Sequence, residues 1–193
     1  MAQEATTGVE QDPGTGQAVR TDLDHSNTIR AGVFGIQDGI VSNFGLVMGV
    51  AGAQISRAAV LIAGVAGLIS GAISMGAGEY VSVRTQRELL EAGRAVDDDE
   101  NVSPYRAAAA NGLLFAVGGS LPLLPFVLFA AGGVAVAVSA AVSVLALFTA
   151  GAALTRLTKQ HPLRSGLRIV VIGGGAGLLG YVVGSLLGGS INL

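Results

Sequence analysis

The sequence predicts an all-α integral membrane protein with five transmembrane helices. Asp, Glu, Lys and Arg make up only 12% of the 193 residues, about half of the usual share, which is too few charges for a soluble surface. The mean hydropathy is +0.63. Apolar stretches of about 20 residues, each long enough to cross a ~30 Å hydrocarbon layer as a helix, recur five times along the chain.

Residues 1–28 are expected to form a disordered, uncleaved polar tail. They contain five acidic residues against one arginine, and no apolar run that could act as a signal sequence. Residues 29–193 are predicted to form the membrane domain. Its helices are predicted at about 29–52, 58–92, 105–130, 134–157 and 167–188.

Local residues define the ends of two of these helices. The second helix should continue past the membrane, because 80–92 lacks a helix breaker and has two Arg–Glu pairs at i,i+4 spacing, Arg84/Glu88 and Arg87/Glu91. The third should begin at Ser103-Pro104, which suits an N-cap and a first turn. The prolines of Leu121–Pro125, followed by Gly132-Gly133, predict that it ends there in a tight outer turn.

The basic residues predict the orientation of the chain. Ten of the eleven fall on one side of the predicted membrane, and only Arg57, between the first two helices, falls on the other. Because Lys and Arg favour the cytoplasmic side, the N-terminus is predicted inside and Leu193 outside. An odd number of helices agrees with ends on opposite sides.

Composition and motifs exclude several classes of function. A net charge of −2, with Lys and Arg kept out of the apolar stretches, excludes a protein that binds a nucleic-acid backbone. The absence of cysteine excludes disulfides and thiolate metal sites. No serine, histidine and acid arrangement indicates an enzyme.

One glycine motif imitates a dinucleotide-binding turn. The run Gly175-Ala-Gly-Leu-Leu-Gly180 has the right spacing, but that fold needs a further strand and an acidic residue, and neither follows. Glycines at near four-residue spacing instead predict close helix packing, at Gly173, Gly177, Gly180, Gly184 and Gly188.

Asp38 is the one acidic residue deep within an apolar stretch. An ionised carboxylate there costs about 2.5–3.5 kcal/mol on insertion scales, and such residues are functional by default. Gly35 and Gly39 flank it and would let another backbone, water or an ion approach. Asp38 is therefore interpreted as an ion or proton site; the alternative is a carboxylate merely satisfied by Ser42 or Asn43.

Met75 and Glu79 lie four residues apart in the second helix and so share one face. Carboxylates alone suit Mg²⁺ and Ca²⁺, whereas a thioether tilts selection toward transition metals such as Fe²⁺, with Mn²⁺ close behind. Met75 alone would more often be packing filler. Beside Asp38 and Glu79 it becomes a candidate metal ligand. The two histidines, His25 and His161, lack neighbouring partners and are expected to be interfacial.

Three segments of the chain resemble the vacuolar iron transporter family. They are Arg30–Asn43 (RAGVFGIQDGIVSN), Leu46–Gly52 (LVMGVAG) and Gly71–Val83 (GAISMGAGEYVSV). Shorter matches follow at Gln86–Glu88, Pro104–Ala107 and Pro122–Pro125, so the likeness covers about residues 30–193.

This resemblance implies a homodimer that exports Fe²⁺, and often Mn²⁺, from the cytosol in exchange for protons, with an ion path at the dimer interface. The family's membrane carboxylate matches Asp38, its methionine matches Met75, and the acid of the same motif matches Glu79. In this interpretation Asp38 binds the ion or a proton, Met75 supplies selectivity and Glu79 is an inner relay. No cofactor is expected; the partners are divalent transition-metal ions, the lipid bilayer and a second copy.

One region departs from the family. Typical members carry a Glu- and Met-rich helical domain between the second and third helices, which is reduced here to about residues 90–103, as in the shorter, nodulin-like branch. Glu88, Glu91 and the acidic run 97–100 could stand in for its metal-collecting residues, the run by attracting cations at long range. The short form leaves an alternative function open, a non-transporting membrane scaffold or metal sensor.

The helices do not specify which membrane they cross. Arg outnumbers Lys ten to one, and Ala and Gly are abundant, as in proteins from GC-rich bacterial genomes. We therefore expect a bacterial plasma membrane, or the vacuolar membrane if the chain is eukaryotic.

Overall fold

A computed structural model describes residues 13–93, 103–129, 132–158 and 161–191. Within these ranges the chain forms helices and short connections, without a strand. The elements are α1 (Pro13–Gly52), α2 (Arg57–Glu91), α3 (Pro104–Ser120), the 3₁₀ turn η1 (Leu121–Leu123), α4 (Leu124–Leu128), α5 (Gly133–Thr158) and α6 (Pro162–Ile191).

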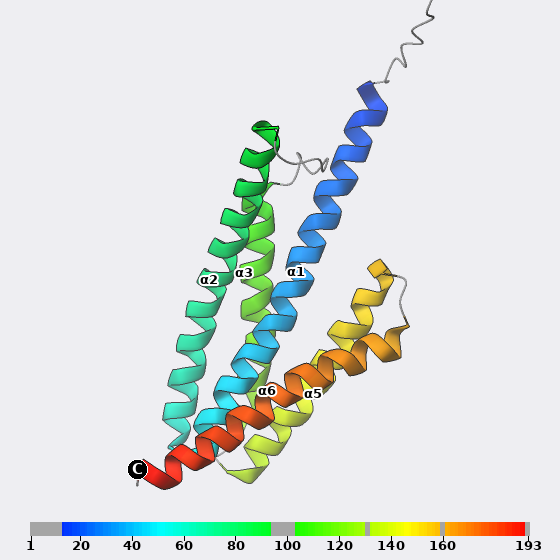
Figure 1. The fold of residues 1–193 in the computed structure, drawn as a ribbon. Coiled ribbons are helices and arrows are strands. Elements are labelled where there is room, and N and C mark those ends of the chain that lie inside the picture. The colour runs from blue at the N-terminus through cyan, green and yellow to red at the C-terminus, as the bar shows by residue number, and fades with distance from the viewer. Residues whose placement is uncertain (1–12, 94–102, 130–131, 159–160, 192–193) are drawn as a thin grey trace, which may run out of the picture.

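Five segments are long and apolar enough to cross a membrane. They confirm the predicted order of membrane helices, with α3, η1 and α4 together forming the third. The start of α1 and the C-terminus lie at opposite ends of the molecule in Figure 1, as an odd number of crossings requires. The spans are Thr28–Gly52, Arg57–Glu91, Pro104–Leu128, Gly133–Thr155 and Pro162–Ser190.

The start of α1 differs from the prediction. The helix begins at Pro13, whereas the sequence predicts a disordered tail through residue 28. Hydropathy marks where the chain enters the hydrocarbon, but a helix continues until a residue breaks its hydrogen-bond pattern, and residues 17–31 contain neither Gly nor Pro. Residues 1–12 lie outside the described part of the chain.

The third span bends at its prolines and continues. Pro122 and Pro125 lack backbone N–H groups, and the chain tightens into η1 between α3 and α4. Ser139 of α5 donates a hydrogen bond to the Pro122 carbonyl at 2.7 Å, within a buried contact. The span therefore passes through Leu121–Pro125 and continues to Leu128, in agreement with the predicted range of about 105–130.

α2 is longer than the membrane is thick. Its 35 residues span about 52 Å at 1.5 Å per residue, against roughly 30 Å of hydrocarbon. Near its C-terminal end Arg84 Nε donates to Glu88 Oε1 at 2.8 Å, so the predicted continuous helix and this ion pair are confirmed. The polar end of α2 therefore extends beyond the hydrocarbon.

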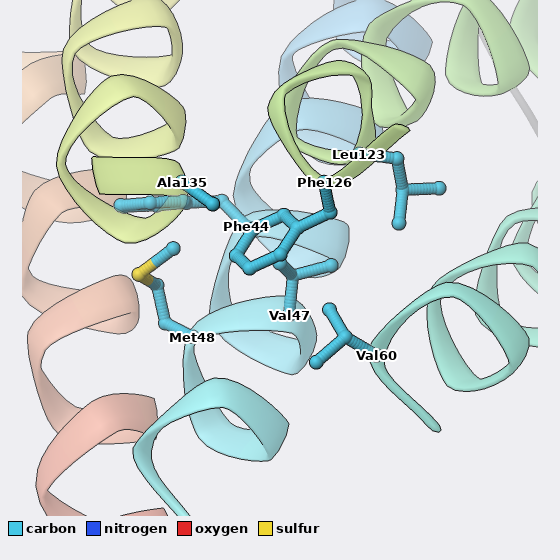
Figure 2. Close-up of a cluster of buried hydrophobic side chains, with 7 residues drawn as sticks. All are labelled: Phe44, Val47, Met48, Val60, Leu123, Phe126 and Ala135. Atoms are coloured by element: carbon cyan, nitrogen blue, oxygen red, sulfur yellow. The ribbon is translucent and has the colours of Figure 1, made fainter. Parts of the chain in front are cut away.

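α1 is the central helix of the molecule and contacts α2, α3, α5 and α6. In Figure 1, α2 and α3 run beside α1, while α5 and α6 form a hairpin across its second half. A cluster of buried apolar side chains, which we call the outer cluster, gathers there (Figure 2). It comprises Phe44, Val47, Met48, Val60, Leu123, Phe126 and Ala135.

Glycines bring α1 and α6 into backbone contact. A Cβ added to Gly184 would meet the carbonyl of Gly49, and one added to Gly180 would meet the carbonyl of Gly45. This contact confirms the predicted small-residue packing of the last helix. It also shows that the run ending at Gly180 is helical and forms no dinucleotide-binding turn.

Candidate functional site

A cavity of about 460 Å³ lies between α1 and α2, with one aromatic ring of α3 on its wall. Two of the predicted site residues, Asp38 and Met75, line it together. We call it the Asp38 cavity. Its remaining lining is small or polar except for Leu46 of α1 and Phe115 of α3, and comprises Ser42, Asn43, Leu46, Gly67, Ser70, Gly71, Ser74 and Phe115.

Asp38 is positioned by the way α1 packs against α3. A Cβ at Gly35 or Gly39 would meet the backbone carbonyl of Asn111 or Phe115, so α3 itself occupies the space that these glycines leave. Asp38, between them in sequence, is half-buried and faces the cavity. Among the described residues its carboxylate accepts one hydrogen bond, from Ser42 Oγ to Oδ1 at 3.1 Å.

Met75 differs from the other methionine of the membrane region. Met48 is 3% exposed and packs in the outer cluster. Met75 is half-buried on the wall of the Asp38 cavity and belongs to neither described cluster of buried apolar residues. Its thioether therefore lines the same cavity as a carboxylate, and the two together are a donor set suited to a transition-metal ion.

Glu79 does not line the cavity. It lies about 6 Å farther along α2 than Met75, in the direction of the polar end. Its Oε2 accepts a hydrogen bond from Nδ2 of Asn111 at 3.2 Å, and Asn111 is only 1% exposed. The structure therefore places Glu79 between the cavity and the predicted cytoplasmic end of α2, held by α3.

Several polar groups at this site were not predicted from the sequence. Asn111 holds Glu79, and Ser70 and Ser74 line the cavity. The sequence suggests Asn43 only as a partner of Asp38, whereas its Nδ2 donates a hydrogen bond to the carbonyl of Gly119. The signal that identifies Asp38 applies to these residues as well. Amide and hydroxyl groups inside apolar stretches also cost free energy unless they find a partner.

The lower-ranked candidates lie elsewhere. Glu88 pairs with Arg84 near the end of α2, with both side chains more than half exposed, and Glu91 is exposed one turn later. The acidic run 97–100 lies outside the described residues, and His161 is exposed just before α6. Within the described ranges, no three His, Asp or Glu side chains come close enough together to hold a metal ion.

Comparison with known proteins settles the family. The model of the VIT family matches residues 29–101 and 90–185, which together include all five membrane spans over most of their length. This chain belongs to the VIT family. The resemblance drawn from its first two membrane helices is thereby confirmed.

Curated relatives in the VIT family match most of the chain. Vacuolar iron transporter homolog 1 of Oryza sativa subsp. japonica is 37% identical over 187 residues, covering 91% of this chain and 80% of that protein. Homolog 2 of the same species is 37% identical and covers 80% and 88%, respectively. Homolog 2.1 of Arabidopsis thaliana is 34% identical and covers 78% and 77%.

Proposed function

We propose that this VIT-family protein carries Fe²⁺ and Mn²⁺ out of the cytosol across a membrane in exchange for protons. The observation that carries the proposal is the pairing of Asp38 and Met75 on the wall of one cavity at membrane depth. The names of the plant relatives support a metal ion as cargo. They favour a vacuole-type membrane over the bacterial plasma membrane that the Arg-to-Lys ratio suggests.

Asp38 couples the two fluxes in this proposal. Its carboxylate attracts a divalent ion, and protonation cancels the charge that holds the ion in place. An ion and a proton therefore compete for the same group, so that release of one accompanies uptake of the other. The hydrogen bond from Ser42 holds one carboxylate oxygen, which keeps the group oriented as its occupant changes.

Met75 and Glu79 have different roles in this proposal. Met75 selects the ion, and Glu79 gives the ion access to Asp38. The thioether favours Fe²⁺ over hard ions such as Ca²⁺, because soft ligands select softer cations. Glu79, held by Asn111 at the cytoplasmic side of the cavity, acts as a relay through which the ion passes before it reaches Asp38. N-in/C-out orientation follows from the distribution of basic residues.

A second copy of the chain completes the site in our proposal. α2 is the least covered span, with only 11% of its most apolar window buried. Its exposed face beside the cavity carries small side chains at Ala66, Ser70 and Ala77, which allow another helix to approach closely. Because one copy brings so few charged ligands together, a twofold axis here would double the set.

Flux measurements on purified protein in liposomes test this function. We expect Fe²⁺ and Mn²⁺ uptake that depends on a pH gradient, with much weaker uptake of Ca²⁺ and Zn²⁺. Asp38→Asn, nearly isosteric but unable to ionise, should abolish flux while the protein remains folded in detergent. Asp22→Asn makes the same change on α1 outside the membrane span and should leave flux unchanged.

The same experiment distinguishes transport from the alternative function, a membrane scaffold or metal sensor. A scaffold or metal sensor would bind Mn²⁺ in detergent but show no flux in liposomes. Wild-type flux in Asp38→Asn would remove Asp38 from the transport path. Flux that ignores the pH gradient would contradict proton exchange.

A further inference from the structure

Asn43 is the most unusual polar residue on the wall of the Asp38 cavity. It is only 2% exposed, and it lies on α1 one residue beyond Ser42. Its side-chain oxygen Oδ1 is buried and has no hydrogen-bond partner among the described residues. A buried carbonyl oxygen without a partner is costly, and native structures retain few of them.

The orientation of this amide is fixed by chemistry. Nδ2 of Asn43 donates to the backbone carbonyl of Gly119 on α3 at 2.6 Å. A carbonyl can only accept, so the amide nitrogen must face Gly119, and the flipped orientation would place two acceptors against each other. Oδ1 is therefore held on the side of the amide that faces away from α3.

On that side the oxygen lies near Gly67 of α2, in a space that the side chain of Leu46 also enters. A Cβ added to Gly67 would stand 3.3 Å from Oδ1 of Asn43. Asp38, Asn43 and Met75 all line the same cavity, which contains enough space for an ion with part of its hydration shell. An unpaired oxygen, held in place at the wall of a cavity that a carboxylate and a thioether also line, has the properties of a ligand once the flexible side chain of Leu46 moves aside.

We propose that Oδ1 of Asn43 is a third protein ligand of the transported ion, beside the carboxylate of Asp38 and the thioether of Met75. This inference rests on the proposed transport function. Amide oxygens are hard, neutral donors that suit Mn²⁺ and complement the softer sulfur. Because the amide does not titrate, Asn43 binds the ion equally well at any pH, and the exchange with protons stays at Asp38.

Two substitutions test the oxygen and the nitrogen of this amide separately, one by covering the oxygen and the other by replacing the nitrogen. Gly67→Ala leaves Asn43 and its bond to Gly119 intact but places a methyl group over Oδ1. Asn43→Asp keeps an oxygen at that place but cannot donate to Gly119. If the oxygen binds the ion, Gly67→Ala should weaken Mn²⁺ binding at least about tenfold, as the loss of groups around metal sites commonly does. Asn43→Asp should retain or tighten binding, because it keeps an oxygen ligand and adds a negative charge beside the ion.

The measurement is Mn²⁺ binding by the full chain in detergent, followed by Mn²⁺ flux in liposomes. Gly175→Ala is the control for the glycine change, since a Cβ there meets no atom within 4 Å. The new methyl of Gly67→Ala would also press on Cδ2 of Leu46, a side chain that is 38% exposed and able to move. The pair Leu46→Ala/Gly67→Ala removes this contact and should keep the weakened binding.

The opposite pattern would overturn the inference. If Asn43 serves only to join α1 to α3, Asn43→Asp should lower thermal stability and Mn²⁺ binding, while Gly67→Ala binds like the wild type. Recovery of binding in Leu46→Ala/Gly67→Ala would show that displaced Leu46, rather than a covered oxygen, caused the defect. Wild-type protein that neither binds nor transports Mn²⁺ would instead contradict the proposed function.

Discussion

Two methionines in the membrane region allow a direct test of the sulfur as a ligand. Met75→Leu keeps most of the volume of the side chain and removes only the thioether. We expect its preference for Fe²⁺ over Ca²⁺ to fall by roughly tenfold if the sulfur contributes about 1.4 kcal/mol to Fe²⁺ binding. Competition between the two ions during uptake into liposomes measures this preference.

Met48→Leu is the matched control for that change. Met48 lies in the outer cluster, where a Met-to-Leu exchange usually costs less than about 1.5 kcal/mol of stability. Its ion preference should equal that of the wild type. Unchanged preference in Met75→Leu as well would make Met75 a packing residue.

The sequence indicates some residues of the site and not others, for a physical reason. Asp38 stands out without a structure because a charge inside an apolar stretch costs energy wherever its neighbours lie. The role of Asn43 depends on which of its two amide groups finds a partner, and that partner, Gly119, is 76 residues away. Asn111 likewise meets Glu79 only through the packing of α3 on α2.

At the scale of helices, the contact between α1 and α6 depends on the absence of side chains. A Cβ at Gly184 would meet the backbone carbonyl of Gly49, which cannot move without moving the helix. Gly184→Ala should therefore lower the stability by about 1–3 kcal/mol, the usual cost of overpacking. Thermal unfolding in detergent measures this loss.

Gly175→Ala on the same helix provides the contrast. Gly175 has no atom near enough to touch a new methyl group, so the substitution should be neutral or gain up to about 1 kcal/mol from the higher helix propensity of alanine. Equal effects at Gly175 and Gly184 would mean that helix propensity, rather than the α1–α6 contact, governs both positions.

Arg57 shows why one basic residue lies on the predicted outer side. Its Nε donates to the carbonyl of Phe126 at 2.6 Å, and its Nη2 donates to that of Val127 at 2.5 Å. These carbonyls lie at the end of α4, where a helix has no further N–H groups to offer them. Arg57 therefore joins the start of α2 to the end of the third span.

Removing this guanidinium should destabilise the protein without inverting it. Arg57→Gln would lose charge-assisted hydrogen bonds worth roughly 1.5–3 kcal/mol where they are buried, and less here because the contact is partly exposed. We expect a lower unfolding temperature in detergent, with partial recovery in Arg57→Lys. A change in membrane orientation would show that Arg57 acts on topology instead.

The sequence predicts the helical elements better than it predicts their ends. Hydropathy determines where the chain crosses the membrane, and all five predicted crossings are present. Hydropathy does not indicate how far a helix continues in water, so the start of α1 at Pro13 was predicted wrongly. The bend at η1 depends on partners such as Ser139, which the sequence does not place beside Pro122.

At the scale of the whole molecule, the outer cluster and the Asp38 cavity lie at different depths along α1. Val47 and Met48 lie about two to three turns beyond Asp38 on α1, and Val60 on α2 lies on the same side of Met75. For the proposed transport we expect these buried apolar side chains to keep a hydrated ion in the cavity from reaching the predicted outer side. If the proposed transport proceeds by alternating access, the outer cluster should open during the cycle.

The absence of cysteine makes this closure measurable. Ser74→Cys places a single thiol on the cavity wall, Thr85→Cys places one near the polar end of α2, and Ile55→Cys places one in the connection from α1 to α2. A membrane-impermeant thiol reagent applied from either side of oriented vesicles then reports which side reaches each position.

We expect the thiols of Ser74→Cys and Thr85→Cys to react from the cytoplasmic side, and that of Ile55→Cys to react from the outer side. Mn²⁺ should slow the reaction of Ser74→Cys alone, because only that thiol shares a cavity with Asp38. Reaction of Ser74→Cys from the outer side, with Ile55→Cys as the marker of that side, would mean that the outer cluster does not seal the cavity. Reaction of Thr85→Cys and Ile55→Cys from the opposite sides would instead reverse the orientation inferred from the basic residues, and the direction of transport with it.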